Sequence, residues 1–186
     1  MIEAYTAVGN AEYQLHIHAV GDGAVQLSLD ALQRSQKITG KRDARHSLAH
    51  VELATKYDIN RMNKLGITTD LTTSGSVSML PASSNKMTNE IITNNKNTYE
   101  SPLKSLIDAG VNVAIASDYA TSDSNTMASI SGAITLNGAK ENFLEDQIGS
   151  FEVGKTADIV VLNKNLFKIN TKDIPNVKIE MTLFRR

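Results

Sequence analysis

Residues 15–25 read LHIHAVGDGAV, and this run passes from a strand through one tight turn into a helix. A short strand is predicted over residues 13–20, and Gly21-Asp22-Gly23 supplies the turn. From residue 24 onward, apolar side chains recur at helical spacing until the polar residues before Gly40, which predicts an amphipathic helix. The unit is therefore a β-strand followed directly by an α-helix.

The alternation of strands and helices continues toward the middle of the chain. Further strands are predicted at residues 45–51, 67–71 and 111–116, and further helices at 56–65 and 102–109. Gly66 and Gly110 follow these two helices, and glycine commonly ends a helix. Strands that alternate with helices form a parallel sheet with helices packed on it, so the sequence predicts an α/β fold.

The alternation is interrupted once and then stops. Residues 72–100 are rich in Ser, Thr and Asn, which predicts a long loop. A helix is predicted over residues 127–143, and the strands expected at 159–162 and 177–184 have no helix between them. We therefore predict two parts, an α/β domain over residues 1–147 and a small β appendage over residues 148–186.

The composition excludes several classes of protein. Hydrophobic residues make up 41% and charged residues 21% of the 186 residues, as in ordinary globular proteins. The formal charge of −1 gives no field for binding nucleic acid or an anionic membrane. The absence of cysteine excludes disulfides and thiolate metal sites, and no run approaches the ~20 apolar residues of a membrane span. We expect a cytoplasmic protein without nucleic-acid or membrane partners.

Three residues that can bind a metal end predicted strands. His18, His50 and Asp118 each come at the carboxyl end of a strand, immediately before a loop. The carboxyl ends of parallel strands converge on the active site in α/β folds, so these side chains are expected to approach one another. Two imidazoles and a carboxylate suit Zn²⁺ or a similar divalent ion. The pattern predicts a divalent metal site, with zinc as the favoured ion.

Simpler interpretations of the same residues stay open. A single histidine near a strand end is commonly a hydrogen-bonded structural group, and Asp118 could cap the turn after its strand. Asp22 is expected to cap the following helix rather than to contact a substrate. His16 and His46 are expected to be structural and are not counted as ligands.

Four segments, taken in chain order, resemble the amidohydrolase superfamily. The run at residues 15–25 resembles its HAxGD strand, turn and helix, and RHSLAH at 45–50 resembles its RHxIEH strand, with Ala49 where glutamate is usual. Ser117-Asp118 resembles the GSD strand end, and IGSFEVGKTADIVVL at 148–162 is similar to the GSLEVGKxADLVVLD segment. The branch with the greatest resemblance contains N-substituted formamide deformylases and exoenzyme-like amidohydrolases.

The resemblance implies a fold and an activity. The fold is the later half, strands five to eight, of a (β/α)8 TIM-type barrel, followed by part of a small C-terminal β-sandwich. His18 and His50 end strands five and six and would bind the metal. Asp118 ends strand eight, where it would bind the metal and take a proton from the attacking water. The implied reaction is hydrolysis of amide or related C–N bonds in a small amide-like molecule.

The departures from the family pattern concern the other half of the metal site. The His-x-His pair of the first strand and the lysine or glutamate of the fourth strand have no counterpart in the sequence. We therefore expect either a homo-oligomer or pairing with a missing N-terminal half. The alternative is a non-catalytic fragment or remnant that acts as a structural or binding protein.

Overall fold

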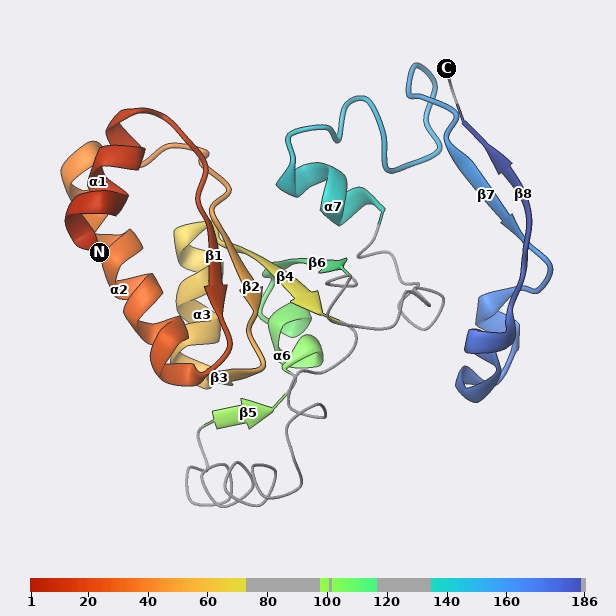
Figure 1. Ribbon diagram of the computed structural model, residues 1–186, viewed down its shortest axis with the longest axis horizontal. Helices are drawn as coiled ribbons and strands as arrows, with labels where there is room; N and C mark the ends of the chain where they lie inside the picture. The colour runs from red at the N-terminus through yellow and green to blue at the C-terminus, as the bar shows by residue number, and fades with distance from the viewer. Residues whose placement is uncertain (73–97, 101, 117–134, 185–186) are drawn as a thin grey trace.

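Four parallel strands form the main sheet, in the spatial order β1-β2-β4-β6 (Figure 1). The computed structural model describes residues 1–72, 98–100, 102–116 and 135–184. The strands are β1 (His16–Ala19), β2 (Ser47–His50), β4 (Thr68–Thr72) and β6 (Asn112–Ala116). Because each neighbouring pair runs in parallel, the parallel sheet predicted from the alternation is confirmed.

Three helices connect these strands, namely α2 (Asp22–Thr39), α3 (Lys56–Leu65) and α6 (Leu103–Asp108). The buried side chains of α2 recur at spacings of three and four residues, which gives the helix one apolar face. Helix α3 has the predicted bounds, since the Thr55 hydroxyl accepts a hydrogen bond from the amide of Asp58 at its start. It ends at Gly66, which has the left-handed φ of 68°.

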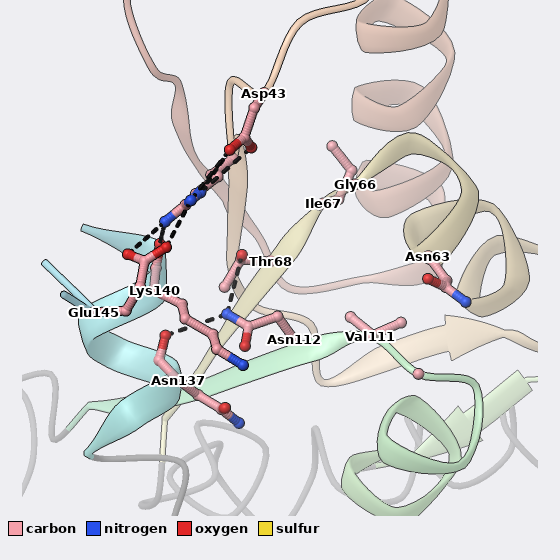
Figure 2. A pocket seen from close by; sticks show the side chains of 12 residues that line it. Asp43, Asn63, Gly66, Ile67, Thr68, Val111, Asn112, Asn137, Lys140 and Glu145 are labelled. Atoms are coloured by element: carbon pink, nitrogen blue, oxygen red, sulfur yellow. Dashed lines mark hydrogen bonds and ion pairs between the residues drawn. The ribbon is translucent and has the colours of Figure 1, made fainter. Parts of the chain in front are cut away.

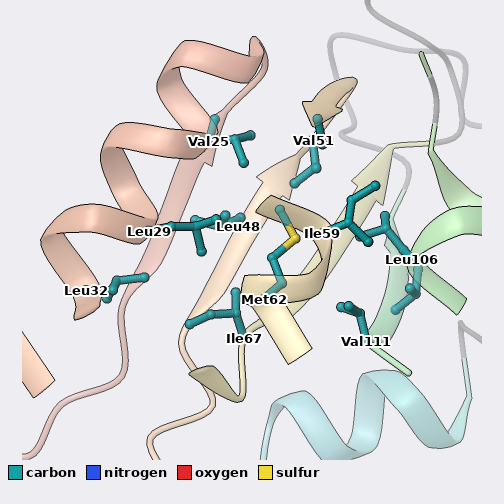
Figure 3. Close-up of a cluster of buried hydrophobic side chains, with 13 residues drawn as sticks. Val25, Leu29, Leu32, Leu48, Val51, Ile59, Met62, Ile67, Leu106 and Val111 are labelled. Atoms are coloured by element: carbon teal, nitrogen blue, oxygen red, sulfur yellow. The ribbon is translucent and has the colours of Figure 1, made fainter. Parts of the chain in front are cut away.

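The hydrophobic core lies between the sheet and these helices (Figure 3). Alternate residues of the strands, among them Ile17, Leu48 and Val113, point toward the helices and join the core. The fully or largely buried members of this core are Ala19, Val25, Leu29, Leu32, Leu48, Val51, Ala54, Ile59, Met62, Ile67, Leu106, Val111 and Val113. The residues between them point to the opposite face of the sheet, and many are polar, among them His16, His18 and Asp70. We call this the polar face.

One helix and one two-stranded ribbon were not predicted. Helix α1 (Ile2–Asn10) packs on α2, and Gly9 permits the close approach, because a Cβ there would lie 3.1 Å from Thr39 Cγ2. Strands β3 (Leu53–Thr55) and β5 (Thr98–Glu100) form a two-stranded antiparallel ribbon. The prediction of a loop was wrong at β5, and residues 73–97 lie outside the described residues.

The predicted helix at residues 127–143 is confirmed only in part. Helix α7 covers Leu136–Glu141, and Thr135 at its start is not helical. Residues 127–134 lie outside the described part of the chain. The side-chain amide of Asn137 donates to the carbonyl of Val113 at 2.9 Å, so α7 is attached to strand β6.

The C-terminal strands form their own antiparallel sheet. Strand β7 (Ile159–Leu162) pairs with β8 (Ile179–Leu183), apart from the main sheet (Figure 1). Two short 3-10 helices, η3 (Leu166–Lys168) and η4 (Thr171–Asn176), lie between them, where no helix was predicted. Among the described residues, no helix combines the length and the apolar character needed to cross a membrane.

Candidate functional site

The imidazole rings of His18 and His50 are in contact at the carboxyl ends of β1 and β2. Their centroids are 4.5 Å apart and their planes are inclined by 70°. His18 is exposed on the polar face of the sheet, and His50 is half-buried. The expectation that these two side chains approach each other is therefore met.

The orientation of the His50 ring depends on the neighbouring strand β4. Its Nδ1 atom lies 3.3 Å from the hydroxyl oxygen of Thr72, the last residue of β4. When Nδ1–H donates to this hydroxyl, Nε2 carries the lone pair and is the atom available to a metal. A hydrogen bond of this kind fixes both the tautomer and the direction of a ligating histidine.

The third predicted ligand, Asp118, lies outside the described residues. Strand β6 ends at Ala116, which pairs with Thr72 and so lies at the same end of the sheet as His50. In the ranges that the structure describes, no set of three or more His, Asp or Glu residues is arranged to hold a metal ion. Two neighbouring imidazoles suit zinc chemically, but they make up only part of a site.

A polar cluster occupies the amino-terminal end of the same sheet face. The His16 ring lies 2.6 Å from the Ser47 hydroxyl through Nδ1, 3.8 Å from Glu141 and 4.0 Å from Asp70. Burial raises the pKa of the Glu141 carboxyl, and a hydrogen bond with Ser47 partly offsets this effect. His16 thus contacts other side chains of the sheet and α7, in keeping with the structural role expected of it.

Sequence reasoning missed Ser47, Asp70 and Glu141. Ser47 lies in β2 and Asp70 lies in β4. The strand register places both side chains on the same face of the sheet as His16 and His18. The available signal was the two-residue periodicity of a strand, which places Ser47 and Asp70 on the face opposite their core neighbours Leu48 and Leu71. For Glu141 no such signal existed, since it reaches the sheet from α7 only through the tertiary fold.

His46 is a buried structural residue. Its Nδ1 accepts a hydrogen bond from the amide of Leu15 at 3.0 Å, which connects β2 to the segment before β1. Burial, together with the nearby charge of Arg42, lowers the pKa of His46 to about 4. The ring is neutral at physiological pH. Its Nδ1 lone pair accepts a hydrogen bond from the backbone, so this nitrogen is not available to bind a metal.

A pocket of about 510 Å³ is lined by Thr68 and Asn112, the first residues of β4 and β6 (Figure 2). It therefore lies at the opposite end of the sheet from His18 and His50. Arg45 lies beside it and forms ion pairs with Glu145 and Asp43. The Asn112 amide bonds to Thr68 and to the backbone of α7. In parallel α/β folds ligands bind outside the carboxyl ends of the strands, whereas this pocket lies at their amino ends. The pocket is accordingly separate from the candidate metal site.

Comparison with known sequences gives a match over nearly the whole chain. A sequence profile described as the amidohydrolase family matches residues 3–137 and 126–185. The Arabidopsis thaliana protein LONG AFTER FAR-RED 3 is 24% identical over 194 aligned residues, which cover 90% of this chain and 33% of that protein.

Two solved structures have a similar fold. One is an adenosine deaminase from Xanthomonas campestris with bound Zn, at a TM-score of 0.62 and 18% identity. The other is a prolidase complexed with N-methylphosphonate-L-proline, at a TM-score of 0.62 and 20% identity. Each comparison covers 98% of this chain and 47% of the other, so the chain spans less than half of either structure.

Proposed function

Because the chain belongs to the amidohydrolase family, we propose that it supplies part of the active site of a metal-dependent hydrolase of C–N bonds. The observation that carries this proposal is the contact between the His18 and His50 rings at adjacent strand ends. The substrate class is a small molecule with an amide or related C–N bond. The names of two similar structures, a deaminase and a prolidase, are in keeping with this class.

The architecture that accompanies this function is the later half of a (β/α)8 barrel. In this proposal β1, β2, β4 and β6 are consecutive barrel strands, and residues 148–186 belong to a small β-sandwich. The parallel order of the strands and the helices on one face support it. The narrower relationship to N-substituted formamide deformylases rests on the motifs in the sequence and stays a prediction.

The proposed roles follow from what each side chain can do. His18 and His50 would hold a divalent ion, by preference zinc, through ring nitrogens, and Thr72 would keep the His50 ring in place. Such an ion lowers the pKa of a bound water to about 7. Asp118 would accept a proton from the attacking water and deliver it to the leaving nitrogen.

A complete site needs ligands from outside the described residues. Within these residues β1 pairs with β2 alone, so its other edge is open to a further strand. We propose that a homo-oligomer or an N-terminal half of the barrel covers this edge and supplies the remaining ligands.

The test is to express the longest reading frame that contains these residues and to measure bound zinc, manganese and iron. Hydrolysis of a panel of N-acyl compounds is then compared with that of His18→Ala, Asp118→Asn and Lys104→Ala. The first two changes should abolish turnover, while the exposed Lys104 should have no effect. A folded wild-type protein with neither metal nor hydrolysis would refute the proposal.

A second candidate is a non-catalytic protein with a structural or binding role. It is favoured by the observation that the described residues offer two neighbouring imidazoles and no third ligand. It predicts weak or absent zinc binding and an assembly larger than a monomer by light scattering. A monomer with tight stoichiometric zinc would exclude it.

A further inference from the structure

The backbone at His50 and Val51 departs from regular strand geometry. Both residues have positive φ, 74° at His50 and 45° at Val51, although neither is glycine. The Val51 amide donates to the carbonyl of Ala49, two residues earlier, at 3.1 Å. A positive φ spanned by such a bond marks the rare and strained form of the γ-turn. The same amide also donates to Ala19 at 3.0 Å, so the turn lies within the hydrogen-bonded ladder to β1.

This turn exchanges the sides to which His50 and Val51 point. Leu48 lies in the core, so strict alternation would place Ala49 on the polar face, His50 toward the helices and Val51 back on the polar face. The structure shows the reverse for the last two residues. The His50 ring lies against His18 on the polar face, and Val51 is fully buried in the core.

The positive φ values at His50 and Val51 cost free energy, which points to a functional role for the turn. Glycine takes a positive φ without steric penalty, whereas a β-branched residue such as Val51 in this region is an outlier. Strained residues of this kind persist where the surrounding structure holds them, and they concentrate at functional sites. Here the chain accepts the strain at two successive residues, and the result is an imidazole beside His18.

We infer that the γ-turn at residues 49–51 is a positioning device that directs the His50 imidazole toward His18, with Val51 as the positioning residue that holds it. Burial of the Val51 side chain in the hydrophobic core stabilises the turn. The inference rests on the proposed function for the role of the ring as a metal ligand. The strain itself does not depend on that role.

The first experiment measures the strain with paired substitutions in the full chain. At His50 the glycine variant should melt about 3 °C higher than the alanine variant, because alanine keeps the Cβ that opposes a positive φ. The matched pair is His18→Gly and His18→Ala, in the regular strand β1. There the order should invert, since glycine weakens a strand. If His50→Gly melts no higher than His50→Ala, the inference is overturned.

The second experiment tests positioning through zinc binding. Val51→Ala and Leu48→Ala each shorten a core side chain, one just after β2 and one within it, and both should lower the melting temperature. Only Val51→Ala should also weaken zinc binding, by about tenfold, as expected when support for a ligand is lost. Equal zinc affinity in the two variants would overturn the inference. Both variants are made in the longest reading frame that contains these residues, the protein on which the proposed function is tested. If that wild-type protein binds no zinc, the proposed function fails, and the melting comparison at His50 alone decides whether the turn is strained.

Discussion

The amide of Leu15 donates to Nδ1 of His46 over 3.0 Å, so a buried imidazole connects the entry of β1 to β2. The interaction requires an unprotonated Nδ1. Because burial lowers the pKa of His46 to about 4 from its ordinary value of 6.5, the folded protein resists protonating this ring while the unfolded chain does not.

Acid should therefore destabilise the fold through His46. The unfolded state takes up a proton below pH 6.5 and the folded state only near pH 4, so stability is lost as the pH falls between these values. Between pH 7 and pH 5 the loss is about 2 kcal/mol. Urea unfolding at the two pH values measures it. In His46→Gln, whose amide oxygen can still accept from Leu15, the loss should be smaller by that amount. An equal loss of unfolding free energy in the wild type and in His46→Gln would show that His46 does not cause the acid sensitivity.

Thr72 is expected to set the zinc affinity through His50. Thr72→Val keeps the shape of the side chain but removes the hydroxyl 3.3 Å from Nδ1, and zinc affinity should fall about tenfold. Thr72→Ser restores the hydroxyl and should restore most of the affinity. Competition with a chromophoric chelator provides the measurement. A valine variant that binds zinc as tightly as the wild type would show that the hydrogen bond does not set the affinity.

The parallel sheet could be predicted because its signals are local. Helix α3 matches its predicted bounds, since Thr55 at its start and Gly66 at its end are terminal signals that act within a few residues. The approach of His18 to His50 followed from strand ends in a parallel topology. These features needed no knowledge of distant contacts.

The missed features depend on tertiary contacts. Glu141 reaches His16 across 125 residues of sequence, which no periodic pattern encodes. The turn at His50 reverses the alternation on which strand predictions rely, so the sequence indicated a regular strand through residue 51. Strand β5 is three residues long and is defined by its pairing with β3. Three residues, Thr98–Glu100, are too few to show the alternation of polar and apolar side chains that predicts a strand.

Replacing Glu141 by glutamine should stabilise the protein at alkaline pH. Burial raises the pKa of this carboxyl, so its contribution is favourable at low pH and is lost as the pH rises through the folded pKa. At pH 8 the charged carboxylate opposes folding, and the neutral amide removes that cost. Chemical denaturation of Glu141→Gln and wild type at pH 8 compares them. A less stable variant would mean that attraction to His16 outweighs burial.

Arg61 is expected to be essential to the packing of α3 on α2. It bonds to Asp58 at 2.9 Å and to Asp30 at 2.6 Å, and Asp58 is almost completely buried. Arg61→Met leaves Asp58 without this partner and should cost about 3–5 kcal/mol of unfolding free energy. Lys104→Met breaks the exposed pair with Asp108 and should cost no more than about 0.5 kcal/mol. Similar costs for the two variants would contradict this view of the buried network.

The two glycines of the GSFEVGK segment should differ in their tolerance of alanine. Gly149 and Gly154 both have positive φ, 93° and 97°, so alanine is strained at either position. At Gly154 the added Cβ meets open space, and the cost should be the backbone strain of about 1 kcal/mol. At Gly149 it would lie 2.8 Å from the Cβ of Ala139 in α7, which adds a packing clash and raises the total to about 3 kcal/mol.

Thermal and urea unfolding of Gly149→Ala and Gly154→Ala measure this difference. Gly149→Ala together with Ala139→Gly removes the opposing Cβ and should recover part of the loss, because the closest contact is gone. If the double variant is no more stable than Gly149→Ala, glycine is required for its backbone conformation and because an added Cβ would lie 3.0 Å from the Cα of Leu136. Recovery would show that this glycine is needed to seat the C-terminal segment against α7, the helix that also brings Glu141 to the sheet.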